Sequence, residues 1–189
     1  MIEVELKARV ADRRAVEARL REFATEVGTF DKRDAYWHGP EWRINRGTRG
    51  FRVRSENDSF TVTFKNKRSE GGIEINRERE FAIADLAVFT EFIERLGCEP
   101  FFEKRKIGSR WEWRSEDSSR PIVLELLEVP GLGLFLEIEA LVADEDPSAI
   151  ALARGEISLL LEKSGLDESA IEPRYYSELL MEAGLGPRW

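Results

Sequence analysis

Apolar and polar residues alternate strictly over the first ten positions of the chain. The alternation places Ile2, Val4 and Leu6 on one side of an extended segment, and Glu3, Glu5 and Lys7 on the other. A period of two is typical of a β-strand. The same pattern recurs and predicts about nine strands, at residues 2–10, 30–38, 50–55, 59–67, 73–82, 99–107, 109–115, 121–129 and 134–143.

Helical spacing between and after these strands predicts three or four helices. They begin after the cap Asp12, at about residue 85 and at Asp146-Pro147, and a short last one carries Leu179 and Leu180. Residues 39–50 read as a mobile loop. Because consecutive strands follow one another with short connections, we expect an antiparallel sheet, and so many strands can curl into a barrel.

The polar faces of these strands carry charges, and the sign of the charge differs from strand to strand. Bases lie at Arg52, Arg54, Lys65, Lys104 and Lys106, and acids at Glu3, Glu5, Glu74, Glu78, Glu80, Glu137 and Glu139. For one strand alone, the solvent face of a half-buried sheet explains the pattern best. For the whole set, the apolar helix stripes favour helices outside the strands. The charged faces would then line the inside of a barrel, bases opposite acids.

The composition of the chain limits the cellular compartment and the classes of binding partner that we expect. The chain has 189 residues, a net charge of −8 and a single cysteine, Cys98. No apolar run approaches the roughly 20 residues of a membrane-spanning helix, and the start MIEVELKARV does not resemble a signal peptide. We therefore expect a cytoplasmic protein that binds neither membranes nor long nucleic acids, because a phosphate backbone is attracted by a basic field.

A charged lumen of this kind suits a small polyanion together with a divalent metal ion. Arg52 and Arg54 project from one face about 6–7 Å apart, which suits successive phosphoryl groups, and lysines add point charges. Paired carboxylates and phosphates are the oxygen ligands that Mg²⁺ or Mn²⁺ prefers. A Walker-type phosphate loop is missing, and the one histidine, His38, gives little support for a zinc site.

Seven blocks of the sequence resemble a known family, the CYTH superfamily or triphosphate tunnel metalloenzymes. Its N-terminal E-x-E-x-K strand is similar to Glu3–Lys7. Its later blocks are similar to Phe51-Arg52-Val53-Arg54, Thr63-Phe64-Lys65, Arg77-Glu78-Arg79-Glu80, Lys104-Arg105-Lys106, Val129–Glu139 and Arg174–Leu180. The family often has an aspartate where this chain has Leu127. Glu125, two residues earlier on the same strand face, is a candidate to replace it.

The resemblance implies an α+β fold over residues 1–189: one domain with an eight-stranded antiparallel closed barrel flanked by helices, as a monomer or homodimer. It also implies Mg²⁺ or Mn²⁺ as cofactor and the following roles. Glu3, Glu5, Lys7 and Glu139 are catalytic; Glu3, Glu5, Glu137 and Glu139 bind metal; and Arg52, Arg54, Lys65, Glu78, Glu80, Lys104 and Lys106 bind substrate.

Three functions fit this resemblance. The first is hydrolysis of a small triphosphate, either inorganic, thiamine or nucleoside triphosphate. The second is a class IV adenylate cyclase, which makes cyclic AMP and pyrophosphate from ATP and shares most of the site. The third is a non-catalytic protein that binds triphosphates or nucleotides, and Leu127 favours it.

Overall fold

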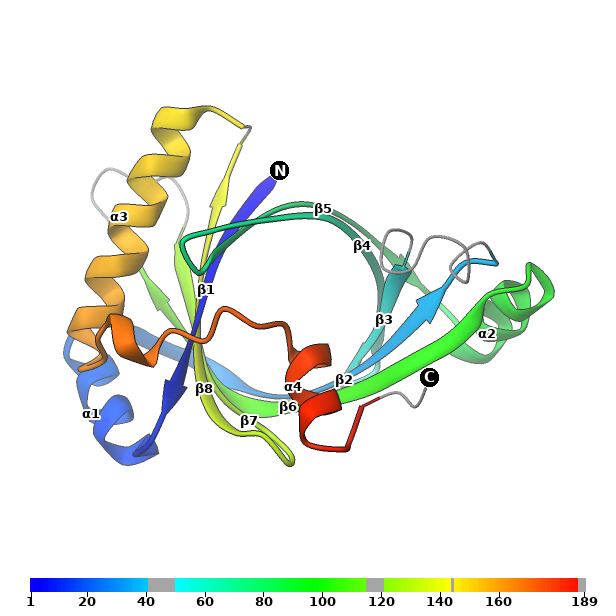
Figure 1. The fold of residues 1–189 in the computed structure, drawn as a ribbon, viewed down its shortest axis with the longest axis horizontal. Helices are drawn as coiled ribbons and strands as arrows, with labels where there is room; N and C mark the ends of the chain where they lie inside the picture. Colours follow the sequence, from blue (N-terminus) through cyan, green and yellow to red (C-terminus); the bar gives the residue numbers. More distant parts are fainter. Residues whose placement is uncertain (41–49, 115–120, 144, 187–189) are drawn as a thin grey trace.

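Eight antiparallel strands close into a barrel in the computed structural model, which describes residues 1–40, 50–114, 121–143 and 145–186 (Figure 1). Around the barrel the order is β1-β5-β4-β3-β2-β6-β7-β8. The strands are β1 (Ile2–Val10), β2 (Thr25–His38), β3 (Gly50–Glu56), β4 (Ser59–Glu70), β5 (Ile73–Ile83), β6 (Glu99–Trp113), β7 (Ile122–Val129) and β8 (Gly133–Val142). The α+β fold with an eight-stranded closed barrel is therefore confirmed.

The alternation pattern overestimated the number of strands by one. The segments 99–107 and 109–115 belong to a single strand, β6, which pairs along its length with β2. Gly108 interrupts the pattern without ending the strand: a Cβ atom there would lie 2.3 Å from the carbonyl oxygen of Leu126 on β7. Glycine is therefore needed for close approach of the two strands. Most of the loop predicted at residues 39–50 lies outside the described residues.

Helices form where the capping residues predicted them. Asp12, Asp85 and Asp146 accept hydrogen bonds from backbone N–H groups in the first turns of their helices. The helices are α1 (Arg13–Phe23), α2 (Leu86–Arg95), α3 (Pro147–Lys163) and α4 (Tyr176–Glu182), with a 3₁₀ turn at Glu168–Ala170. None of the helices in the described part of the chain is both long and apolar enough to cross a membrane.

The hydrophobic core lies outside the barrel, between its wall and the helices. Helices α1 and α3 cover β1, β7 and β8, where their apolar stripes meet Val4, Leu6, Leu124, Leu136 and Ile138, all of them buried. A second cluster joins α2 to Val53 on β3 and Val62 on β4. Because the apolar strand faces point outward to these helices, the alternating charged faces point into the barrel.

The C-terminal segment crosses one mouth of the barrel and places α4 beside β2 and β6 (Figure 1). It is held to β1, where the backbone N–H of Glu172 donates to the carbonyl oxygen of Lys7 (2.8 Å). Tyr176 and Leu179 then pack on inward-facing Phe30, Leu127 and Phe135. The inside of the barrel is therefore apolar where α4 packs against it.

Candidate functional site

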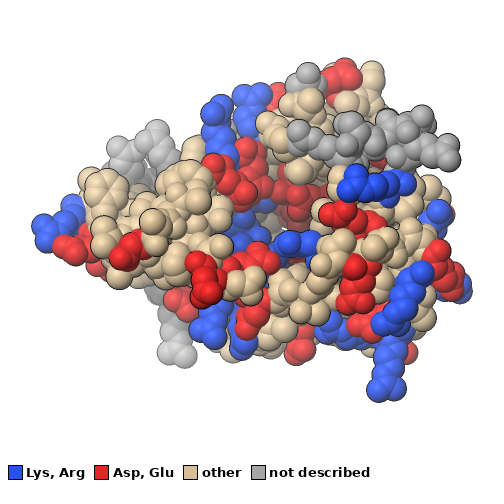
Figure 2. Space-filling view, turned by 180° about the vertical axis from the view of Figure 1, so that it is seen from behind, with Lys and Arg blue, Asp and Glu red and all other residues tan. Residues whose placement is uncertain are grey.

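A cavity of about 1110 Å³ occupies the inside of the barrel. Seen from behind, it is a hollow in which acidic and basic side chains gather (Figure 2). Its lining includes every residue that the sequence predicted for the site: Glu3, Glu5, Lys7, Arg52, Arg54, Lys65, Glu78, Glu80, Lys104, Lys106, Glu137 and Glu139. The structure thus brings all of them together, while their individual roles remain predictions.

Basic and acidic side chains occupy opposite halves of the barrel wall. Among the described cavity residues, β4, β3, β2 and β6 contribute Lys65, Arg52, Arg54, Lys32, Lys104, Lys106 and Arg110, and the neighbouring strands β7, β8, β1 and β5 contribute Glu125, Glu137, Glu139, Glu3, Glu5, Glu74, Glu78 and Glu80. Three inward-facing residues break the rule: Lys7 on β1, Asp34 on β2 and Glu112 on β6. The cavity is therefore an electrostatic cleft with a cationic wall facing an anionic one.

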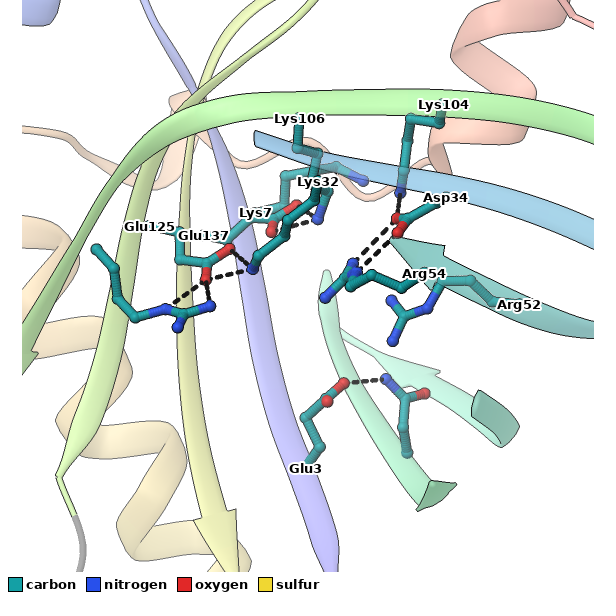
Figure 3. A network of polar contacts seen from close by, with 12 residues as sticks. Glu3, Lys7, Lys32, Asp34, Arg52, Arg54, Lys104, Lys106, Glu125 and Glu137 are labelled. Carbon is teal, nitrogen blue, oxygen red and sulfur yellow. Dashed lines mark hydrogen bonds and ion pairs between the residues drawn. The ribbon is translucent and has the colours of Figure 1, made fainter. Parts of the chain in front are cut away.

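Asp34 organises the cationic wall. Its carboxylate accepts two hydrogen bonds from the guanidinium of Arg54 (2.7 and 3.0 Å) and lies 3.5 Å from Lys104 Nζ (Figure 3). Burial alone would raise the pKa of Asp34, but Arg54 and Lys104 outweigh it and hold that pKa well below its usual value. The carboxylate therefore stays ionised and fixes two cations side by side.

Arg52 and Lys65 continue the cationic wall towards the acids. The guanidinium of Arg52 donates to Thr63 Oγ1 (2.9 Å) and lies 3.4 Å from a carboxylate oxygen of Glu78. Lys65 Nζ donates to Glu3 (2.6 Å) and lies 3.2 Å from Glu78. These contacts hold both cations against the cavity surface.

The lysines Lys106 and Lys32 cross the boundary between the two halves. Lys106 donates to Glu137 (2.7 Å), and Lys32 to Glu125 (2.7 Å), which also accepts from Arg110 (3.0 Å). Burial opposes ionisation of Glu137, yet Lys106 and Lys104 outweigh it and lower its pKa to about 2. These carboxylates are already neutralised by bases of the protein.

Two carboxylates of the anionic wall differ from the others. Glu5 and Glu139 are register neighbours on β1 and β8, and neither has a hydrogen bond or ion pair within the described ranges. Burial, with the charges of Glu137 and Glu3 nearby, raises the pKa of Glu5 to about 8. Burial and Glu3 raise the pKa of Glu139 to about 7.

Such a pair fits a divalent metal ion, since a hard cation would supply the missing positive charge. The described residues include no group of three or more His, Cys, Asp or Glu side chains placed to hold an ion by themselves. Two carboxylates suffice for Mg²⁺ when substrate phosphates and water complete its shell. Of the four predicted ligands, Glu3 is engaged by Lys65 and Asn76, and Glu137 by Lys106. Glu5 and Glu139 therefore fit the ion best.

Leu127 stands where the family often has an aspartate, and its surroundings account for the difference. Its side chain is fully buried among Phe30, Phe135, Tyr176 and Leu179, under α4. A carboxylate there would lose its hydration among these apolar side chains, which is costly. Glu125 does reach the cavity, but its carboxylate is bound by Lys32 and Arg110.

Several residues that face the inside of the barrel escaped prediction from the sequence. Lys32 and Asp34 lie in the stretch Asp31-Lys32-Arg33-Asp34, which has charges on both strand faces and so no apolar face to mark the inside. Tyr176, which lies with its ring 4.5 Å from both Lys7 Nζ and Lys104 Nζ, comes from a helix rather than a strand. The sequence indicated Tyr176 only through the motif at residues 174–180, which lacks the alternation of charged and apolar residues seen in the strands.

Comparison with known proteins places this geometry in a family. A Methanocaldococcus jannaschii protein that bears the name "Putative adenylate cyclase" is 27% identical over 180 residues, which cover 95% of this chain and 98% of the relative. A conserved hypothetical protein from Pyrococcus furiosus is 27% identical, with a TM-score of 0.71 over 94% of this chain and 99% of that one. A Vibrio parahaemolyticus structure described by the same cyclase name has a TM-score of 0.79 at 22% identity, covering 96% of this chain and 98% of that one. The CYTH domain model matches residues 1–176, and the chain belongs to the CYTH domain family.

Proposed function

We propose that this protein is a divalent-metal-dependent enzyme that binds a small triphosphate inside the barrel and hydrolyses it. The observation that carries the proposal is the divided cavity. Its cationic wall faces two carboxylates, Glu5 and Glu139, that have no basic partner among the described residues.

The cationic wall would hold the phosphates. Arg52 and Arg54 project from β3 into the cavity two residues apart, a spacing of about 6.8 Å, and Lys104 and Lys106 repeat that spacing on β6. A triphosphate carries about four negative charges on oxygens that accept forked hydrogen bonds from guanidinium groups. Its oxygens would compete with Asp34 and Glu78 for these cations.

The anionic wall would act on the other side of the phosphates. Glu5 and Glu139 would hold Mg²⁺ or Mn²⁺, which stabilises negative charge on a phosphoryl group when bound. A carboxylate of the same wall would orient water and accept its proton. Lys7 donates a hydrogen bond to the carbonyl oxygen of Arg174. It would thereby hold the C-terminal segment across the mouth of the barrel, beside these acids.

Adenylate cyclase activity is the second candidate, and the name of the Methanocaldococcus jannaschii relative favours it. Cyclisation would use the same phosphate and metal residues. The ribose 3′-hydroxyl of ATP would then be the nucleophile in place of water.

Product analysis separates these functions. The protein is incubated with Mg²⁺ or Mn²⁺ and with ATP, thiamine triphosphate or tripolyphosphate, and the products are separated by chromatography. Free phosphate that requires the metal supports hydrolysis, and cyclic AMP with pyrophosphate identifies the cyclase. Tight binding without any product would contradict both and leave a binding protein.

Replacing Arg52 by alanine should weaken triphosphate binding roughly 10- to 100-fold, because a charge-assisted hydrogen bond is lost. Arg52→Lys should lose less, since it keeps the charge but not the fork. Titration calorimetry with tripolyphosphate measures both. The control is Arg105→Ala: Arg105 lies between Lys104 and Lys106 but points outward to Asp31. Unchanged affinity in Arg52→Ala would remove Arg52 from the site.

A further inference from the structure

The inward-facing residues of β2 and β6 change from charged to aromatic along the barrel. Lys104, Asp34 and Arg54 form one row across β6, β2 and β3. Two residues further along β2, the next row is Phe102, Tyr36 and Arg52. The aromatic surface thus begins one row, about 6.8 Å, from the Asp34 cluster.

Four cavity residues form this surface, here called the aromatic wall: Tyr36, His38, Phe101 and Phe102. The rings of Tyr36 and Phe102 are stacked, 4.2 Å apart and 5° from parallel. Phe101 meets Phe102 edge to face at 5.0 Å and lies 4.1 Å from the ring of His38. Each ring is held by its neighbours, so the wall is a pre-formed apolar surface inside a charged cavity.

The aromatic wall is continuous with the groups proposed to hold phosphate. Lys104 Nζ donates to the hydroxyl of Tyr36 (3.1 Å), and Tyr36 is the register neighbour of Arg52. A triphosphate lying along Arg54, Arg52 and Lys104 would therefore present one end to the wall. An organic group attached at that end would reach the rings without leaving the cavity.

Inorganic tripolyphosphate would gain no binding energy from such a surface, because it is charged along its whole length and would lose hydration against the rings. A planar heterocycle gains from it, since aromatic rings stack or pack edge to face. We propose that the aromatic wall is the binding site for the organic group of the substrate, a triphosphate ester that carries an aromatic heterocycle. This inference rests on the proposed function and narrows its substrate class.

The test compares triphosphates with and without a ring on wild type and Phe102→Leu. Leucine keeps most of the apolar volume but removes the ring face. Calorimetry gives the dissociation constants of the β,γ-imido analogue of ATP, of thiamine triphosphate and of tripolyphosphate, with Ca²⁺, also an oxygen-liganded ion, replacing Mg²⁺ to limit turnover. The matched control is Phe64→Leu, because Phe64 lies on the outside of β4 and is 46% exposed.

We expect Phe102→Leu to weaken binding of at least one ring-bearing ester about tenfold, the scale of one base–aromatic contact. Affinity for tripolyphosphate should stay within about twofold, and Phe64→Leu should change neither. Loss confined to the ATP analogue identifies a nucleotide, and loss confined to thiamine triphosphate identifies the thiamine ester. Phe102→Trp should retain ester binding.

Two results would overturn the inference while leaving the proposed function in place. One is unchanged affinity for both esters in Phe102→Leu. The other is equal weakening of all three ligands, which would mean that Phe102 only supports the phosphate-binding residues. If wild type binds none of the three triphosphates, the proposed function itself fails, and the inference fails with it.

Discussion

Glu5→Gln is expected to abolish metal-dependent turnover, with a loss of at least about 100-fold, while leaving the fold intact. Glutamine keeps the size of the side chain but removes the charge that would hold the metal ion beside the phosphates. Removing one electrostatic partner of a developing charge typically costs 10²- to 10³-fold. Phosphate release with Mg²⁺ or Mn²⁺ measures the loss, and circular dichroism checks the fold.

The same variant should be more stable than wild type in the absence of metal. The folded state raises the pKa of Glu5 from an ordinary value of 4.5 to about 8, through burial and the nearby charges of Glu137 and Glu3. Between these two values the unfolded chain binds fewer protons at this position than the folded one, so wild-type stability falls as the pH rises. Thermal unfolding in EDTA should give Glu5→Gln the higher Tm at pH 8, and the difference should shrink towards pH 4.5.

The combination of lost activity and gained stability separates a metal-binding role from a structural one. Glu128→Gln is the control, because Glu128 lies exposed on the outer face of β7 and should change neither quantity. Wild-type turnover in Glu5→Gln would contradict the assignment of Glu5 as a metal-binding residue. A Tm in EDTA below that of wild type would show that Glu5 stabilises the folded state through its charge.

Much of this fold was readable from residue parity. On β1, strict alternation told the buried outer face from the charged inner one, because the helices cover the apolar side completely: Val4 and Leu6 are 0% and 1% exposed. On β2 the same reading failed, since Asp31 and Arg33 are charged on the outer face while Lys32 and Asp34 are charged on the inner one. A pattern of charges along a strand predicts which face points into the barrel only when the opposite face is apolar.

Parity could not say which carboxylates are available for a metal ion. Glu3 and Glu5 look alike in sequence, as do Glu137 and Glu139. The difference depends on register between strands far apart in the chain: Glu3 meets Lys65 from β4, and Glu137 meets Lys106 from β6. These ion pairs form only when the barrel closes. A sequence motif therefore identifies the set of acidic residues, but not which of them have no basic partner.

Asp34→Asn is expected to cost about 3–5 kcal/mol of the free energy of unfolding, because it leaves two buried cations without their shared counter-charge. Asp34 is 1% exposed and contacts both Arg54 and Lys104. Because its pKa lies well below the ordinary value of 3.8, its contribution is present above that pH and is lost as the pH falls further. Urea unfolding at pH 7 measures the loss, which should shrink in acid.

Asp31→Asn is the matched control, since Asp31 lies on the same strand but pairs outside the barrel with Arg105, both residues being nearly half exposed. It should change stability little, because exposed ion pairs are weak. Tripolyphosphate should bind Asp34→Asn more tightly than wild type and raise its Tm further, since phosphate oxygens would take the place of the lost carboxylate. If the anion stabilises Asp34→Asn no more than wild type, Arg54 and Lys104 do not bind phosphate, and the cationic wall would owe its arrangement to the ion pairs of the fold alone.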